Sequence, residues 1–246
     1  MFTINPFIRE SSGLVRGRTA ERAGGCDHTL VFGFLPREIS LGIAERKQND
    51  RQWMQDRILA TARKLFLKEG FERVTIRAIA RVIEYSPATI YLYFKDKNEI
   101  LHALQNAGFN KLYAEQQTVL SVADPWKRLR KHAGVYLNFA LANPEYYDLM
   151  FIMRGPIAKM KETMKWEEGM RSYNLLRDDV AACMAAGHLK KANIDAATFA
   201  LWSLTHGMAS LVIRERTIMY PADRLNMLIE KAVDFVMAGM HGESGG

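Results

Sequence analysis

Apolar residues recur at helical spacing along most of this chain. Ile58, Ala62 and Phe66 share one face of a first helix, and the other face of that helix carries Arg and Lys. Gly70 follows as a left-handed cap that ends it. The pattern predicts an amphipathic helix that packs its apolar stripe on a core and turns a basic face outward.

Two shorter helices are expected next, joined by a tight turn. Thr75 caps the first of them, which is about two turns long. Ser86 caps the second, and Pro87 occupies its first position, where a missing N–H costs nothing and the fixed φ suits a helix. A helix, a turn and a capped helix form a helix-turn-helix, which inserts its last helix into the DNA major groove.

The last of these helices has small residues at its start and aromatic residues at its end. Ala88 and Thr89 can place methyl groups against thymine, and the Thr89 hydroxyl can bond a base edge. Tyr91 and Tyr93 can donate their hydroxyls to phosphates. The two tyrosines could instead be packing residues at the edge of the core, but their spacing from Ser86 favours DNA.

Three further residues extend the predicted contact set. The helix N-terminus at Thr75 is an anion site that suits a phosphate, and Lys97 lies beside the start of the next helix. Arg77 is the long bidentate donor near the groove, although a solvated surface charge is the alternative for it.

The segment from Arg57 to Leu104 resembles the DNA-binding domain of the tetracycline-repressor (TetR) family. That domain has a helix-turn-helix ending in an aromatic tract and a lysine, here Thr89-Ile90-Tyr91-Leu92-Tyr93-Phe94-Lys95-Asp96-Lys97. The resemblance implies that Thr75, Tyr93 and Lys97 hold phosphates and that Arg77 reads a purine edge. It also implies major-groove contacts from Pro87, Ala88, Thr89 and Tyr91. The family often has glycine where this chain has Glu84, so a left-handed glutamate strained by about 1 kcal/mol, or a different turn, is expected there.

The excess positive charge is concentrated on this segment. The chain of 246 residues has a net charge of +7, and residues 41–97 hold 12 Lys and Arg against 7 Asp and Glu. Residues 1–40 hold 5 against 4, and residues 98–246 hold 17 against 16. Lys and Arg displace condensed counterions from a duplex, so DNA binding is expected to depend strongly on salt.

Beyond residue 97 the pattern stays helical to the end. The expected helices are a connecting helix to Val119, one from Pro125 to Leu141, one from Glu145 to Met153 capped by Asn143, one after Pro156 that ends at Gly187, one begun by Asp195 and one begun by Asp223. No stretch reads as a strand. We therefore predict an all-α fold with an N-terminal three-helix DNA-binding domain and a C-terminal helical domain for ligand binding and dimerisation.

Large and pliable apolar side chains are abundant in the C-terminal part. Any one of them is better explained as core packing, but the ensemble suggests a cavity for a small apolar or amphipathic ligand. The candidate pocket residues are Tyr136, Phe139, Met150, Phe151, Trp166, Met170, Tyr173, Trp202 and His206.

The string Trp202-Ser203-Leu204-Thr205-His206-Gly207 resembles the Trp-x-x-x-His-Gly motif of one class of C-terminal domain in that family, the WHG type. Trp202 and His206 lie one turn apart on one face, and Gly207 would let another helix approach closely. A core histidine bonded to a carbonyl or hydroxyl is the alternative for His206.

The last two expected helices carry apolar residues on more than one face. These residues are Phe199, Leu201, Trp202, Leu204, Leu211, Val212, Ala232, Val233, Phe235 and Val236. Something must cover the second face, and the resemblance implies a homodimer with a four-helix interface. A two-fold dimer would place two recognition helices about one DNA turn apart on a near-palindromic operator.

Four segments are expected: an N-terminal extension (1–45), the helix-turn-helix domain (46–98), the helical domain (99–241) and a flexible tail (242–246). Residues 1–40 lack helical periodicity, which predicts disorder. Leu41 is a candidate for the true initiator, and a basic arm that enters the minor groove is the alternative.

The remaining composition narrows the function class. Cys26 and Cys183 lie far apart without metal-ligand spacing, and no apolar run approaches the roughly 18 residues of a membrane span, so a cytoplasmic protein with reduced thiols is expected. No nucleophile elbow or phosphate-binding glycine loop indicates an enzyme, a cofactor or a metal. The sequence predicts a dimeric repressor relieved by a ligand; a ligand-independent architectural or partner-binding protein and an activator are the alternatives.

Overall fold

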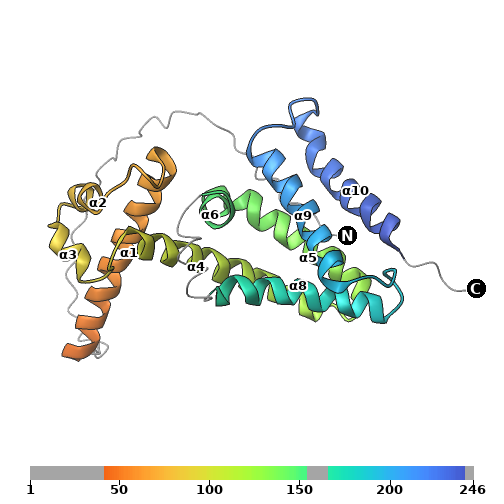
Figure 1. The fold of residues 1–246 in the computed structure, drawn as a ribbon, viewed down its shortest axis with the longest axis horizontal. Coiled ribbons are helices and arrows are strands. Elements are labelled where there is room, and N and C mark those ends of the chain that lie inside the picture. Colours follow the sequence, from red (N-terminus) through yellow and green to blue (C-terminus); the bar gives the residue numbers. More distant parts are fainter. Residues whose placement is uncertain (1–41, 154–165, 242–246) are drawn as a thin grey trace, which may run out of the picture.

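The computed structural model describes residues 42–153 and 166–241, and these residues form helices joined by turns and short loops (Figure 1). The elements are α1 (Ile43–Glu69), α2 (Ile76–Ile83), α3 (Pro87–Tyr91), α4 (Lys97–Gln116), the 3₁₀ helix η1 (Gln117–Ser121), α5 (Pro125–Ala142), α6 (Pro144–Tyr147), the π-helix η2 (Asp148–Ile152), α8 (Glu167–Ala185), α9 (Ile194–Ile213) and α10 (Ala222–Met240). Within the described ranges β-structure is limited to one isolated bridge between Leu189 and His241. The predicted all-α fold is confirmed.

Two groups of helices lie at opposite ends of α4 (Figure 1), and each group encloses its own hydrophobic core. The first joins α1, α2 and α3 to the start of α4, where Ile100 and Leu104 are buried. The second joins the rest of α4, from Phe109 onward, to α5, α8, α9 and α10. One continuous helix therefore connects the two parts of the molecule.

The predicted helix-turn-helix has the expected local geometry. Thr75 Oγ1 accepts a hydrogen bond from the Ala78 N–H at 3.1 Å, and Ser86 Oγ accepts one from the Thr89 N–H at 3.2 Å, so both hydroxyls satisfy backbone donors that a helix leaves free. Glu84 lies in the left-handed region (φ 62°, ψ 38°), where a non-glycine residue is strained. Of the two alternatives expected for this turn, the structure has the left-handed glutamate and not a different turn.

Several predicted helix boundaries were wrong. The first helix begins at Ile43, well before residue 57, and Glu45 stabilises its start by accepting a hydrogen bond from the Gly42 N–H at 2.9 Å. Asn143 is the N-cap residue of α6 as predicted, but its side chain makes no capping hydrogen bond, because its amide donates to the Phe139 carbonyl of the preceding helix. The helix expected to begin at Asp195 begins one residue earlier, at Ile194, and Asn193 caps it.

The expected helices at either end of the second core also differ in detail. The helix predicted from Glu145 to Met153 is divided into α6 and the π-helix η2. Gly108 on α4 permits the close approach of η2, because a Cβ atom there would lie 2.5 Å from Met150 Sδ. The last helix begins at Ala222, one residue before the predicted start at Asp223.

Two expectations concern α9, and the one about apolar runs was wrong. A Cβ atom on Gly207 would meet no atom of the described residues within 4 Å, so the close approach of another helix is not made there and stays a prediction. By length and composition α9 could cross a membrane, with a mean hydropathy of 1.4 and 28% of the apolar window buried. Ser and Thr make up most of its polar residues. They carry no charge but interrupt the apolar residues, so the sequence did not show α9 as one apolar run.

Some predictions fall outside the described residues. These are the disorder of residues 1–40, the initiator at Leu41, the start of the helix after Pro156 and the tail from residue 242. Of the predicted extension, the structure describes residues 42–45, which form the cap and first turn of α1.

Candidate nucleic-acid interface and ligand cavity

Helix α3 exposes two of its four predicted DNA-contacting residues and leaves the other two half-buried. Ala88 is exposed and Tyr91 is 56% exposed, while Pro87 and Thr89 are half-buried. Ile90, on the opposite face, is fully buried and anchors the short helix on the first core. The helix is therefore held rigidly with one face free to meet a groove.

Two hydroxyl groups at the start of α3 form a pair. Ser86 Oγ and Thr89 Oγ1 lie 3.0 Å apart, and either can be the donor. Whichever hydroxyl donates within the pair, the other keeps its hydrogen for an external acceptor. The pair thus offers one oriented hydroxyl donor on the exposed side of the helix.

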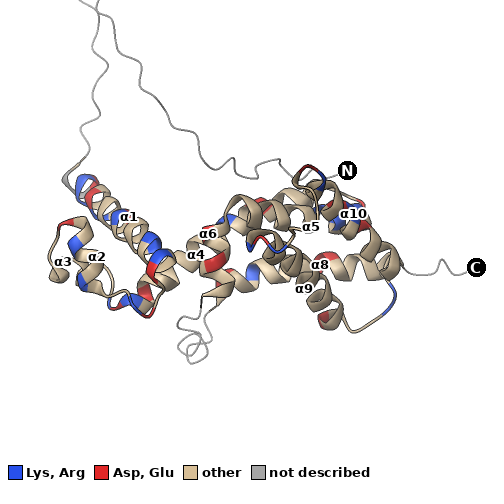
Figure 2. Cartoon of the chain, turned by 90° about the horizontal axis from the view of Figure 1, so that it is seen from above, with Lys and Arg blue, Asp and Glu red and all other residues tan. Residues whose placement is uncertain are grey.

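The predicted phosphate and base contacts surround this helix. Thr75 and Arg77 are exposed at the start of α2. Tyr93 is half-buried beneath Arg51, whose guanidinium carbon lies 5.3 Å from the ring centroid. Arg51 was not predicted from the sequence, because it lies in the polar first half of α1, which was not expected to be helical. Figure 2 shows Lys and Arg gathered along α1 and around α2 at this end of the molecule.

Lys97 is placed differently from the other predicted contacts. Its Nζ donates to the carbonyl oxygens of Phe71 (3.0 Å), Glu72 (3.2 Å) and Val74 (3.4 Å). An ammonium group has three N–H bonds, so all of them are used within the protein. The predicted phosphate contact stays a prediction that requires this ammonium to leave the turn between α1 and α2.

A cavity of about 200 Å³ lies within the second core, between α4, α5, η2, α8, α9 and α10. Most of its wall is aromatic or aliphatic. Six of the nine residues predicted for a pocket line it: Tyr136, Phe151, Trp166, Met170, Tyr173 and Trp202. Phe139 and Met150 are instead buried in the surrounding core, and His206 lies outside the lining.

His206 is held by two tyrosines beside the cavity. Its Nδ1 lies 2.9 Å from the Tyr136 hydroxyl, and its ring stacks on Tyr147 with the centroids 5.1 Å apart. Burial lowers the pKa of His206 and raises that of both tyrosines. The predicted alternative, a core histidine bonded to a hydroxyl, describes this position.

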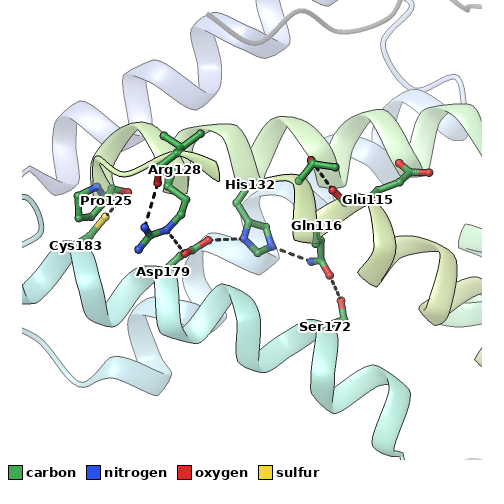
Figure 3. Close-up of polar contacts among 10 residues, drawn as sticks. Glu115, Gln116, Pro125, Arg128, His132, Ser172, Asp179 and Cys183 are labelled. Carbon is green, nitrogen blue, oxygen red and sulfur yellow. Dashed lines mark hydrogen bonds and ion pairs between the residues drawn. The ribbon is translucent and has the colours of Figure 1, made fainter. Parts of the chain in front are cut away.

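A largely buried chain of polar side chains adjoins the cavity, and three of its members, Gln116, His132 and Ser172, line it (Figure 3). Arg128 Nε donates to Asp179 Oδ1 at 2.6 Å, and Asp179 Oδ2 lies 2.8 Å from His132 Nδ1. His132 Nε2 lies 2.8 Å from Gln116 Nε2, and Ser172 Oγ donates to Gln116 Oε1 at 2.7 Å. We call these five residues the polar relay; it links the end of α4 to α5 and α8.

The polar relay was not predicted from the sequence, although a signal was present. Gln116 and Ser172 each occupy the apolar stripe of a helix, four residues after Leu112 and four before Leu176. A polar residue in such a stripe is buried, and a buried polar residue requires partners. The partners themselves could not be deduced, because they lie 16 or more residues away along the chain.

The thiol beside the relay is unreactive. Cys183 is buried, its Sγ donates to the Pro125 carbonyl at 3.0 Å, and burial raises the pKa of the thiol to about 12. Among the described residues no group of three His, Cys, Asp or Glu side chains could hold a metal ion.

Comparison with known families and proteins yields matches over both parts of the chain. Residues 58–104 match the family model described as "Bacterial regulatory proteins, tetR family", and residues 129–236 match "Tetracyclin repressor-like, C-terminal domain". The HTH-type transcriptional repressor NicS of Pseudomonas putida is 29% identical over 147 residues, which cover 57% of this chain and 67% of NicS.

Solved structures share the fold. PfmR, a TetR family transcriptional regulator from Thermus thermophilus, superposes with a TM-score of 0.58 at 23% identity, covering 78% of this chain and 98% of PfmR. FadR from Bacillus subtilis, a transcriptional regulator solved in complex with stearoyl-CoA, has a TM-score of 0.60 at 16% identity and covers 74% of this chain and 97% of its own.

Proposed function

This chain belongs to the TetR family of DNA-binding transcriptional regulators, and from that premise we propose that it is a ligand-relieved repressor acting as a homodimer. The observation that carries the proposal is the course of α4. Lys97 at its start is bonded to the helix-turn-helix part, and Gln116 at its end lines the cavity. A change in the cavity can therefore be transmitted to the DNA-binding helices through one rigid element.

We assign the DNA contacts to the exposed side of α2 and α3. Ala88, Thr89 and Tyr91 face the major groove, with the hydroxyl pair of Ser86 and Thr89 donating to a base or a phosphate. Pro87 starts this helix at the groove edge. Thr75 and Tyr93 hold phosphates, and Arg77 reads a purine edge.

The exposed apolar residues of α9 and α10 support a dimer. Phe199 (61% exposed) and Leu211 (52%) on α9, and Met227 (58%) and Phe235 (80%) on α10, belong to these two helices, which lie at one edge of the molecule (Figure 1). Isologous packing against a second copy would remove this surface from water. A partner helix, rather than a membrane, is then the neighbour of the apolar α9.

Relief of repression follows from linkage. If a ligand fits the cavity better in a conformation whose two recognition helices do not match successive major grooves, ligand and DNA weaken each other's binding by the same factor. Eight aromatic or Met residues on the wall suit an apolar or amphipathic ligand. The protein then acts in the cytoplasm by binding alone, without catalysis.

Selection from a random duplex DNA library with the purified full-length chain tests the proposal. A near-palindrome with half-sites about one helical turn apart is expected. Tyr91→Ala, which alters an exposed ring, should weaken the enrichment without unfolding the protein. Binding without a motif, lost uniformly as salt rises, would instead support the architectural alternative.

A reporter promoter containing the selected site then distinguishes a repressor from an activator. Co-expression of the protein should lower transcription from this promoter and leave a promoter with a scrambled site unchanged. Raised transcription would contradict the repressor assignment while leaving operator binding intact.

A further inference from the structure

One part of the cavity wall is polar, in contrast to its aromatic surroundings. Gln116, His132 and Ser172 come from α4, α5 and α8, line the cavity, and are each 6% exposed or less. Burying three polar side chains beside a cavity is costly unless their hydrogen bonds are made. The bonds that they make, and the capacity that they leave unused, define what the cavity can bind.

The direction of each hydrogen bond in the polar relay follows from Asp179. Its carboxylate only accepts, so His132 donates from Nδ1 and, when neutral, accepts at Nε2. The group facing His132 Nε2 must then be the Gln116 amide nitrogen, which leaves Gln116 Oε1 to accept from the Ser172 hydroxyl. With a neutral His132, each of these donors has a single consistent assignment.

Two hydrogen-bonding groups at the cavity wall remain unused. The Gln116 amide has a second N–H, since one of its two is given to His132. The Ser172 oxygen has donated its hydrogen to Gln116 and keeps its lone pairs. The wall therefore offers one donor and one acceptor side by side, which is the complement of a hydroxyl group.

The charges around the cavity argue against an ionised ligand group there. The described lining contains no Lys, Arg, Asp or Glu. Arg128, the nearest cation of the relay, is paired with Asp179 at 2.6 Å. Among the residues that the structure describes here, a carboxylate would lose its hydration without gaining an unpaired cation, whereas a neutral hydroxyl would lose little.

The rest of the wall suits a flat ring. Phe109 lies at the centre of an aromatic cluster, with edge-to-face contacts to Phe151 (centroids 5.5 Å apart) and Trp166 (5.3 Å). Tyr136, Tyr173 and Trp202 complete the aromatic lining. Aromatic rings stack on such surfaces with more energy than their buried area alone provides.

We propose that the cavity binds an uncharged aromatic compound carrying a hydroxyl group, which donates to Ser172 Oγ and accepts from Gln116 Nε2. This inference rests on the proposed function in one respect, which is the role of α4. Gln116 is the last residue of α4, so a ligand bonded to it acts directly on the helix that reaches the DNA-binding part.

The test compares three probes that share one ring system: 2-naphthol, 2-methylnaphthalene and 2-naphthoate. Their affinities for the full-length protein are measured at neutral pH by quenching of tryptophan fluorescence, since Trp166 and Trp202 line the cavity. We expect 2-naphthol to bind at least about tenfold more tightly than either of the other two, as one satisfied hydroxyl is worth about 1.4 kcal/mol. Ser172→Ala should abolish this preference, whereas Ser203→Ala, on an exposed position of α9, should retain it.

Thermal unfolding of Ser172→Ala establishes that the variant is folded before its affinities are compared. If that variant is unfolded, Ser172→Thr, which keeps the hydroxyl and narrows the cavity, should retain the preference for 2-naphthol while binding all three probes more weakly. Equal affinity for 2-naphthol and 2-methylnaphthalene, tighter binding of 2-naphthoate, or no binding of any probe would each overturn the proposal. DNA binding is measured separately on the selected site, so a failed ligand prediction stays distinct from a failed repressor.

Discussion

The ammonium group of Lys97 closes the turn between α1 and α2 by contacting Phe71 twice. Nζ lies 4.4 Å from the centroid of the Phe71 ring and 3.0 Å from the carbonyl oxygen of the same residue. Carbonyls at Glu72 and Val74 complete its hydrogen bonds. The first residue of α4 is thus fixed to the segment that precedes α2, a structural role in addition to any contact with DNA.

Lys97→Met is expected to destabilise the protein by about 2 kcal/mol, because it removes a charged donor from three carbonyls of which two are partly buried. Thermal unfolding measures this loss. The slope of log affinity for DNA against log salt should stay unchanged, as the ammonium neutralises no phosphate in this geometry. Lys95→Met, at a nearby exposed position, is the control for a loss of charge alone. Unchanged stability with a slope reduced by about 1 would instead identify a phosphate contact.

Arg77→Ala is expected to weaken operator binding by roughly 1–3 kcal/mol and to relax the preference at one base pair, since a guanidinium can bond a guanine edge at two points. Arg81→Ala is the matched control, because Arg81 is also exposed on α2, one turn farther along. Titration of the selected site and of its single-base variants provides the comparison. An equal loss of affinity for every base variant would show that Arg77 contacts the DNA backbone and reads no base.

The sequence predicted the helix-turn-helix well because its determinants are local. Thr75, Ser86 and Pro87 act on backbone groups within three residues, and even the left-handed Glu84 could be foreseen from the turn that it occupies. The start of α1 was missed because its first half exposes residues such as Trp53, so the apolar stripe that predicts a helix weakens there.

The cavity was predicted in part, for a physical reason. Helical spacing identifies residues that point inward, and Tyr136 and Trp202 do so, but spacing cannot separate a cavity wall from the filled core that receives Phe139. The polar relay depends on pairings such as His132 with Asp179, which are made only when distant helices meet.

Acid should destabilise the protein through His206. Burial lowers the pKa of this histidine from its ordinary value of 6.5, so the unfolded chain binds its proton more readily than the folded chain. The stability that His206 contributes is complete above about pH 6.5 and is lost as the pH falls below it. His206→Gln should lessen the decrease in unfolding temperature between pH 7 and pH 5. His102→Gln, at a half-exposed position of α4, provides the comparison, and identical pH profiles for wild type and His206→Gln would rule the mechanism out.

Two glycine substitutions should have opposite effects. Gly108→Ala would place a Cβ atom 2.5 Å from Met150 Sδ and 3.1 Å from Tyr146 Cδ1, and overpacking of this kind costs about 1–3 kcal/mol. Gly207→Ala adds a methyl group where no atom of the described chain lies within 4 Å. It should leave stability unchanged or raise it by up to about 1 kcal/mol through helix propensity. Chemical denaturation of both variants measures the difference, and a Gly108→Ala protein as stable as the wild type would show that α4 and η2 can separate without cost.

A single charge on α10 should separate the dimer without unfolding its protomers. Phe235 is 80% exposed in one chain, so Phe235→Glu should disturb the protomer little, and it places a carboxylate in the proposed interface. Sedimentation velocity should show monomers at concentrations where the wild type is a dimer, with an unchanged circular dichroism spectrum. Operator affinity should fall by more than tenfold, because each monomer then holds one half-site alone.

Leu120→Glu is the control. Leu120 is 55% exposed on η1, outside the proposed interface, and its substitution should preserve both the dimer and the affinity. Dimers that persist in Phe235→Glu would place the interface on another surface.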